Sequence, residues 1–366
     1  MVSERYRRSV KTGLIAGLAL TGLVFASFSA PEAKTLKHLA LRTAHKNTVS
    51  SLAELDRMRQ GSDHMAAGDY ASAIALWTKA VEKDPVNIVV TYNLAYAYYQ
   101  MAMQTRDRAE ALRLLDESEA AFQRVQTLNP ELDVVYFKLG KIALVKGDDM
   151  QAAAYYRLGL QYDPGNAALQ FNLARVYDQL QDYGNAITHY EKAIALDPEF
   201  KYAYNNLGLI HELRGSKAAA EKAYLAALKQ DPAYNFARLN LGNLYADMDR
   251  LPEAKKLYLE ALKLEPDNAY AHLYLGNAYF MTAEFDEAVR HYRISITRKP
   301  DNASAYYLLA ISLSKLNRAD EAMAAGMQYM ALDPNGRFAD EIQDLIISLK
   351  LQQQAGPYAA RKITLP

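Results

Sequence analysis

The residues that carry out most protein chemistry are scattered through this sequence and do not form motifs. The seven histidines show no metal-ligand spacing such as HExxH, and no GxSxG, P-loop or dinucleotide-binding glycine motif occurs. Cysteine is absent, which excludes thiolate nucleophiles, disulfides and iron–sulfur clusters. Carboxylate pairs such as Asp148-Asp149 fit solvated turns. We therefore expect no catalytic site, no metal and no cofactor.

The residues of interest are amides that recur at a regular interval. Asn172, Asn206 and Asn240 follow one another at steps of 34 residues. An amide both donates and accepts hydrogen bonds, which suits it to the backbone of an extended peptide of any sequence. The same residues also fit a purely structural role as exposed polar groups. The wider amide set includes Asn93 at the equivalent earlier position, and Asn243 and Asn277 one helical turn beyond it.

Aromatic and basic residues accompany the amides. Aromatic rings supply contact area at low entropic cost, and the flanking rings are Tyr92, Tyr96, Phe137, Phe171, Tyr202 and Tyr274. Lys138, Lys141 and Arg175 form a basic cluster that would suit a carboxylate clamp. Unrelated solvated charges on helix faces would give the same pattern.

The elements that position these residues follow an internal repeat of 34 residues. The repeat is marked by Pro130, Pro164, Pro198, Pro232, Pro266, Pro300 and Pro334. Ten residues after a proline of this series, a leucine and a small residue occur together, as in Leu207-Gly208. An alanine and a bulky residue recur later in each unit, as in Ala220 and Tyr224. Both sets have helical three and four spacing, which predicts two antiparallel helices per unit, with proline ending one unit and opening the next.

These residues resemble the tetratricopeptide repeat family, which has a 34-residue period, Leu-Gly or Leu-Ala, a later alanine and aromatic, and a closing proline. The resemblance implies an all-α, right-handed superhelical solenoid of about eight helix-turn-helix repeats with a C-terminal capping helix. It also implies that the first helices line a concave groove, so the amides, rings and cations above would face a peptide or protein partner.

We divide the chain on this basis. Residues 54–336 hold eight repeats, of which the second carries 11 extra residues that most simply lengthen its helices. A capping helix is expected at 337–350 and a tail at 351–366, while 32–53 is a basic linker or leading helix. The repeats themselves are expected at 54–87, 88–132, 133–166, 167–200, 201–234, 235–268, 269–302 and 303–336.

The N-terminus predicts export. A basic stretch, residues 1–11, precedes 20 residues without charge, so residues 1–31 form a signal peptide or a membrane anchor that tethers the chain through residues 12–31. The basic flank should stay in the cytoplasm, which places the repeats outside it, in the periplasm or an equivalent extracytoplasmic space. Basic and acidic residues balance at 42 each, so no nucleic-acid partner is expected.

The sequence thus predicts a non-catalytic protein-binding scaffold of the cell envelope that holds an extended peptide or partner protein in its groove. The alternative is a substrate-presenting or assembly accessory subunit of an envelope enzyme or secretion complex. This would be a repeat array like that of O-linked N-acetylglucosamine transferases, without the catalytic domain. A cytosolic co-chaperone would require the N-terminal run to have another role. Partner identity and oligomeric state stay open.

Overall fold

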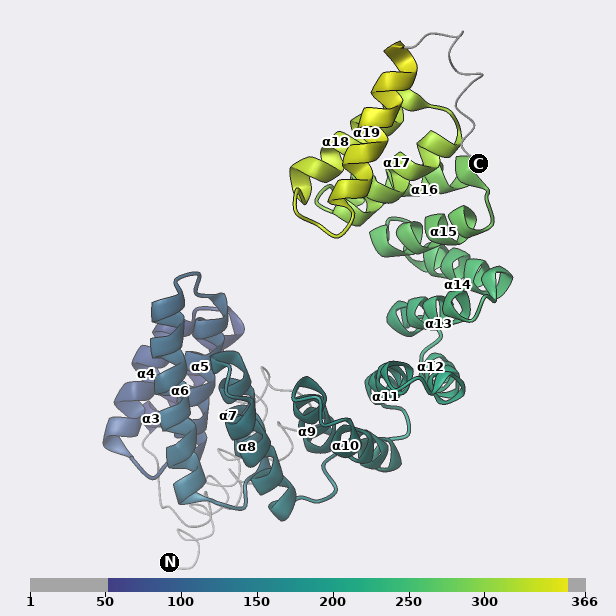
Figure 1. Cartoon of the computed structure of the whole chain (residues 1–366). Coiled ribbons are helices and arrows are strands. Elements are labelled where there is room, and N and C mark those ends of the chain that lie inside the picture. The colour runs from purple at the N-terminus through teal and green to yellow at the C-terminus, as the bar shows by residue number, and fades with distance from the viewer. Residues whose placement is uncertain (1–51, 355–366) are drawn as a thin grey trace, which may run out of the picture. The chain divides into compact units, whose positions relative to one another are not determined.

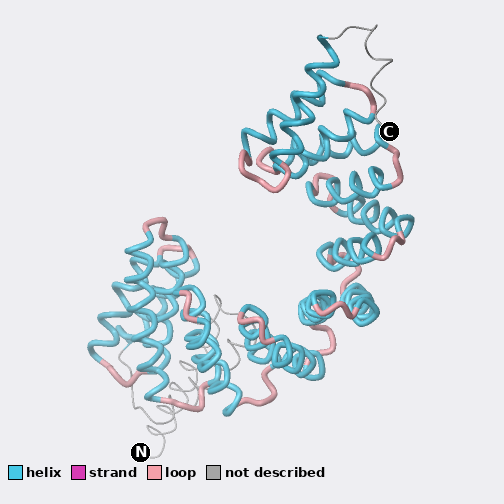
Figure 2. The backbone as a smooth tube through the Cα atoms, viewed as in Figure 1, coloured by secondary structure: helices cyan, strands magenta, loops and turns pink. Residues whose placement is uncertain are grey.

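The computed structural model describes residues 52–354, and this part of the chain consists of helices joined by short turns, without strands (Figures 1 and 2). Backbone contacts divide the chain into two compact units, which meet between Leu196 and Asp197. We describe each unit by itself.

Successive hairpins make up both units. The N-terminal unit contains α3 (Leu52–Ala66), α4 (Tyr70–Lys83), α5 (Ile88–Gln104), α6 (Arg108–Leu128), α7 (Asp133–Lys146), α8 (Asp149–Tyr162), α9 (Ala167–Gln179) and α10 (Tyr183–Leu196). The C-terminal unit contains α11 (Lys201–Leu213), α12 (Lys217–Gln230), α13 (Asn235–Asp247), α14 (Leu251–Leu264), α15 (Ala269–Met281), α16 (Phe285–Arg298), α17 (Ala303–Lys315), α18 (Ala319–Leu332) and α19 (Ala339–Gln354). In the C-terminal unit the first helices α11, α13, α15 and α17 also contact one another in sequence.

The small and bulky positions of the repeat pack together inside each hairpin. The ring of Tyr224 on α12 is fully buried against Gly208 on α11, where a Cβ atom would lie only 2.6 Å from the Tyr224 ring. Tyr258 and Gly242 form the same pair in the next hairpin, at 2.5 Å. Real Cβ contacts are essentially never this short, so glycine is required for the close approach.

Each helix begins and ends at residues that the sequence marks. Every proline of the 34-residue series comes one residue after the C-cap of a second helix, as Pro164 follows Asp163 at the end of α8. Asparagine and aspartate cap several N-termini, and the Asn166 side chain accepts a hydrogen bond of 3.0 Å from the Leu169 backbone N–H. The predicted role of proline as a repeat boundary is confirmed.

The turns inside the hairpins share a left-handed residue. Its φ is 84° at Gly147 and 74° at Gly215, and between 57° and 60° at the non-glycine residues. Six successive hairpins follow this 34-residue rhythm at Gly147, Gln181, Gly215, Asp249, Ala283 and Asn317. A left-handed residue lets the chain reverse directly after the first helix, and it costs an L-residue about 1 kcal/mol.

The extra residues of the second repeat lengthen its helices, as predicted. α5 has 17 residues and α6 has 21, whereas most other hairpin helices have 13 or 14. At the other end of the chain, α19 covers α18, with Ile342 fully buried and Ile346 5% exposed. Gly326 of α18 leaves room for these two isoleucines, which lie 3.2 Å from the place of its absent Cβ.

The all-α repeat fold predicted from the sequence is confirmed. The predicted signal or anchor (1–31), most of the leading segment (32–53) and the end of the tail (355–366) lie outside the described residues. The boundaries that we assigned to the eight repeats stay predictions.

Candidate functional site

Amides connect two first helices in the C-terminal unit. The Asn240 side chain on α13 donates a hydrogen bond of 2.9 Å to Asn205 Oδ1 on α11. Asn205 in turn donates to Asn206 Oδ1 at 3.3 Å. Asn206 and Asn240 are only partly buried, so these two predicted residues lie on one face of α11 and α13. Sequence reasoning missed Asn205, although it stands next to Asn206.

Aromatic rings stand beside these amides, and several of them are exposed. The side chains of Tyr202 and Phe236, at the starts of α11 and α13, are 47% and 72% exposed. Tyr234 lies between them, with its ring centroid 5.4 Å from that of Tyr202 and 5.9 Å from that of Phe236. Partial burial raises the pKa of the Tyr234 hydroxyl to about 12. We call the surface formed by Tyr202, Asn206, Phe236 and Asn240 the first-helix face.

The face continues toward α15 with further rings. Tyr274 is half-buried, and its centroid lies 5.8 Å from that of Tyr258 and 6.4 Å from that of Tyr270, which is 45% exposed. Lys299 donates a hydrogen bond of 2.6 Å to the Tyr270 hydroxyl. A row of apolar area with polar edges is the composition expected of an interaction site.

Two of the predicted amides have a structural role instead. Asn243 Oδ1 accepts a hydrogen bond of 2.7 Å from the Tyr258 hydroxyl, and Asn277 Oδ1 accepts one of 3.0 Å from the Tyr292 hydroxyl. Both tyrosine rings belong to the core, where an unpaired hydroxyl would be costly. This corrects our prediction that Asn243 and Asn277 present their amides to a ligand, since their acceptor oxygens satisfy the core.

The N-terminal unit holds the predicted basic cluster. The Lys138 ammonium lies 4.5 Å from the ring centroid of Tyr96 and 5.9 Å from that of Phe137. The Lys141 ammonium lies 5.7 Å from the Phe137 centroid and 5.8 Å from the Tyr99 centroid. The two lysines therefore share the Phe137 ring, and cation–π contacts hold them in place.

Arg175 approaches this cluster from α9. Burial raises the pKa of the Tyr156 hydroxyl, and the charge of Arg175 opposes that rise. Tyr156 packs against Phe137, with ring centroids 6.3 Å apart, so Arg175 acts on the same aromatic group as the lysines. Burial also raises the pKa of Asp178, again against the charge of Arg175. The cluster therefore contains one carboxylate as well as three cations.

Three predicted residues are buried, which corrects their assignment to an open surface. Tyr92 and Asn93 on α5 are 0% and 2% exposed, and Lys138 on α7 is 5% exposed. The Tyr92 ring packs edge-on against Phe122 of α6, with centroids 5.2 Å apart, so it belongs to the hairpin core. Because the Lys138 ammonium already stacks on Tyr96, a carboxylate ligand would have to compete with that contact.

The other predicted residues of the N-terminal unit are partly buried. Asn172 donates a hydrogen bond of 2.7 Å to the Ala168 carbonyl of its own helix, and Phe171 packs on Tyr190 with centroids 5.7 Å apart. Tyr96 accepts a hydrogen bond of 2.6 Å from Gln100. Asn172 belongs to the N-terminal unit, whereas Asn206 and Asn240 belong to the C-terminal unit. A continuous row of the three amides stays a prediction.

A buried histidine pair escaped sequence reasoning. His272 Nδ1 on α15 lies 2.9 Å from His291 Nδ1 on α16, and His272 Nε2 lies 3.0 Å from the Pro266 carbonyl. Only a protonated nitrogen can bond to a carbonyl, so His272 Nε2 donates and its Nδ1 accepts from His291. Burial lowers the pKa of His291 to about 4, with His272 and Arg290 contributing. The 19-residue spacing also joins Gln170 to His189 at 2.6 Å, and this recurrence was the available signal.

Among residues 52–354 there is no cluster of three or more histidines and carboxylates that could hold a metal ion. In the same range no helix combines the length and apolar character that crossing a membrane requires.

Comparison with known proteins decides the family. A model described as tetratricopeptide repeat matches residues 58–101, 137–198, 171–235 and 282–337, which together exceed half of the chain. A second model, described as TPR repeat, matches residues 242–282. The chain belongs to the tetratricopeptide repeat family.

Known members of this family resemble only parts of the chain. The small glutamine-rich tetratricopeptide repeat-containing protein 2 of Mycosarcoma maydis is 29% identical over 130 residues, which cover 35% of this chain and 34% of that protein. The chain thus spans about a third of that relative. The structure of PilF from Pseudomonas aeruginosa is 25% identical with a TM-score of 0.52, covering 58% of this chain and 96% of PilF. PilW, described as a type IV pilus biogenesis factor, is 20% identical with a TM-score of 0.52, covering 58% of this chain and 98% of PilW, and shows the fold alone.

Proposed function

We propose that this tetratricopeptide repeat protein is a non-catalytic scaffold of the cell envelope that holds an extended segment of a partner protein on the first-helix face. The observation that carries the proposal is the pairing of Asn240 with Asn205 across two helices, beside the exposed rings of Tyr202 and Phe236. Core packing does not require rings at this exposure, whereas an extended peptide can cover them.

Amides and rings offer such a peptide two kinds of contact. Amide groups bond to backbone N–H and C=O groups, which every peptide carries, while aromatic rings cover its apolar side chains. Selectivity by charge would come from Lys138, Lys141 and Arg175 in the N-terminal unit, if the partner carries an acidic stretch or a free carboxylate.

The envelope location rests on the sequence of residues 1–31, a basic stretch followed by a long uncharged segment. We propose that this segment directs export and is then either cleaved or retained as a tether. The repeats would in both cases work outside the cytoplasm.

Affinity capture from the envelope with the intact chain as bait would supply a partner, whose affinity for variants can be measured by titration calorimetry. Replacing both Asn206 and Asn240 by alanine removes hydrogen bonds worth about 0.5–1.5 kcal/mol each. We expect affinity to fall about tenfold or more. The fold should persist, because both amides are partly exposed.

The matched control replaces Gln328 and Gln343, two exposed amides on α18 and α19, by alanine. This variant should bind the partner as the parent does. If the Asn206 and Asn240 variant binds with unchanged affinity while its helicity and melting are intact, the partner docks elsewhere. Reversal of Lys138, Lys141 and Arg175 to glutamate should abolish binding only where the partner presents a carboxylate.

A further inference from the structure

The second helices of two neighbouring hairpins carry the same exposed pattern. On α12 it is Lys222, Leu225 and Lys229, and on α14 the same residue types recur 34 positions later. Leu225 and Leu259 are 48% and 43% exposed, and all four lysines are exposed. We call this set the lysine–leucine face; it comprises Lys222, Leu225, Lys229, Lys256, Leu259 and Lys263.

The repeat pattern itself does not impose this face. The equivalent positions on α10 are Thr188, Glu191 and Ala195, which are neither basic nor apolar as a set. The positions differ from those of the first-helix face, since they lie on the second helix of each hairpin.

The positive charge of this face is not compensated within the described part of the chain. All three acids of α12 and α14 are paired with arginines: Glu221 with Arg250 at 3.1 Å, Glu253 with Arg250 at 3.0 Å, and Glu260 with Arg238 at 3.9 Å. Lys255 is paired as well, with Glu284 at 2.5 Å.

The four lysines of the face make no ion pair among residues 52–354. Since like charges on neighbouring hairpins repel, an arrangement of four uncompensated cations gains when an acidic partner arrives.

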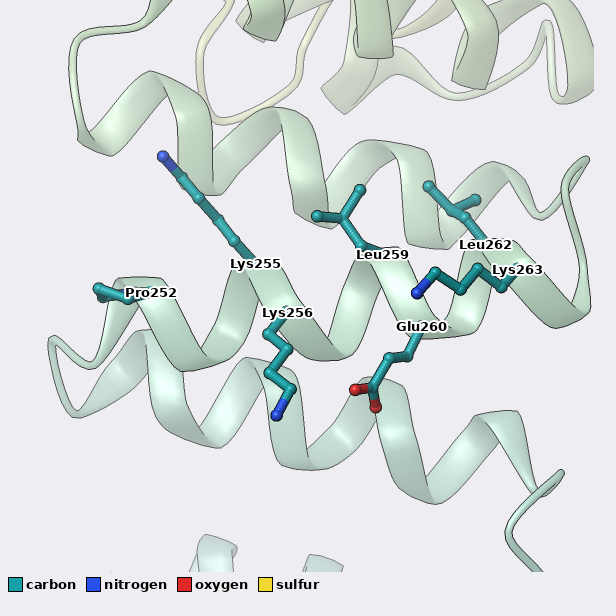
Figure 3. A pocket seen from close by; sticks show the side chains of 7 residues that line it. All are labelled: Pro252, Lys255, Lys256, Leu259, Glu260, Leu262 and Lys263. Carbon is teal, nitrogen blue, oxygen red and sulfur yellow. The ribbon is translucent and has the colours of Figure 1, made fainter.

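The leucines border a hollow. A depression of about 590 Å³ runs along α14 and is lined by Leu259, Leu262, Lys256 and Lys263, among others. Figure 3 shows Leu259 and Leu262 pointing to one side of α14, while Lys256 and Glu260 point to the other. An apolar strip therefore lies next to a charged one along the same helix.

We propose that the lysine–leucine face binds an acidic amphipathic helix of a partner protein. Leu225 and Leu259 would contact the apolar stripe of that helix, and the lysines one turn before and after each leucine would contact its flanking carboxylates. A hollow suits a row of side chains better than a bilayer surface, since a membrane-binding face needs apolar groups that protrude into the lipid.

A direct test uses the whole chain and a synthetic helical peptide. The peptide carries leucines at i, i+3, i+4 and i+7 with glutamates on both flanks, and a scrambled peptide of identical composition lacks the apolar stripe. We expect fluorescence anisotropy to detect binding of the first peptide, weakened by salt, and at least tenfold weaker binding of the second.

Charge reversal identifies the surface. Lys222→Glu, Lys229→Glu, Lys256→Glu and Lys263→Glu together should weaken binding of the amphipathic peptide at least tenfold, because four charge contacts become repulsions. The control reverses four exposed lysines elsewhere, at Lys79, Lys83, Lys192 and Lys315, and changes the net charge equally. It should alter the affinity less than twofold.

A second pair of substitutions tests the apolar half while it keeps every charge. Leu225→Gln with Leu259→Gln should weaken binding severalfold, and both side chains are too exposed for the fold to depend on them. Equal binding of the two peptides, no binding of the amphipathic one, or an unchanged affinity after reversal of the four lysines would overturn the proposal. So would lysine-dependent sedimentation with anionic phosphatidylglycerol vesicles in place of peptide binding.

Discussion

The absent side chain of a glycine fixes the distance between the two helices of a hairpin. Gly208 and Gly242 allow the rings of Tyr224 and Tyr258 to lie where a methyl group would otherwise stand. In the N-terminal unit Gly140 does the same for Tyr156, at a still closer approach. The tyrosine hydroxyls then need partners, which Glu212, Asn243 and Asn277 supply in successive hairpins.

Alanine at these glycines should therefore destabilise the fold, although alanine is the better helix former. We expect Gly140→Ala and Gly208→Ala each to lower the free energy of unfolding by about 1–3 kcal/mol through overpacking, measured by urea denaturation. The control is Gly184→Ala on α10, where the nearest atom to the new Cβ would be Asp182 Oδ1 at an ordinary 3.8 Å. That variant should be as stable as the parent or up to about 1 kcal/mol more stable. Destabilisation of the same size in all three would contradict the close-approach explanation.

At the scale of the element, the buried pair His272 and His291 joins α15 to α16 and is uncharged in the folded state. Tyr279 stacks on His291, with centroids 5.6 Å apart, and the nearby charged groups are Arg290 on α16 and Lys255, which lies 4.3 Å from the Tyr279 ring centroid. Neither nearby cation favours a further positive charge on the pair.

The C-terminal unit should thus lose stability in mild acid. In the unfolded chain a histidine binds its proton near pH 6.5, whereas His291 resists protonation to about pH 4. The unfolded state binds more protons between these values, so stability is full above pH 6.5 and falls as the pH drops toward 4, by up to about 3 kcal/mol. Hydrogen exchange of α15 and α16 amides at pH 6.5 and 5 measures this, since most carboxylates stay ionised in that range. His291→Phe, which keeps the stacking on Tyr279, should flatten the dependence, and an equally steep response in that variant would disprove the assignment.

The sequence predicted the helices and the core of these elements but not every side chain between them. Ala220, Tyr224 and Gly208 are identical or similar in each repeat, so periodicity alone placed them in the interior. The left-handed turn was hidden because glutamine, aspartate, alanine and asparagine all occupy it.

The candidate site was predicted less completely than the core. Asn240 and Asn243 lie one turn apart on the same helix, yet one bonds to Asn205 of the preceding first helix and the other to a core tyrosine. Helical spacing cannot distinguish these directions, because they depend on small rotations of the helix against its neighbours.

At the scale of the whole molecule, each hairpin contacts mainly its neighbours in sequence, as in other repeat proteins. Stability and binding are then built from local interfaces, and the two faces that we propose lie on different helices of the C-terminal unit. The first-helix face is carried by α11 and α13, and the lysine–leucine face by α12 and α14. A scaffold with two faces could hold two partners at once.

Localisation is the property of the whole molecule that the repeats themselves do not encode. If residues 1–31 direct export, a reporter fused after Pro366 should be active only outside the cytoplasm. Deletion of residues 1–31 should leave the reporter inside while helicity and melting are retained, because the first described helix starts at Leu52. Sequencing the N-terminus of the exported chain would then separate cleavage from anchoring, since a cleaved chain starts near residue 30 and an anchored one keeps its basic flank. A cytoplasmic reporter signal from the full-length chain would remove the envelope from the proposed function, and the two peptide-binding faces would have to be tested against cytosolic partners.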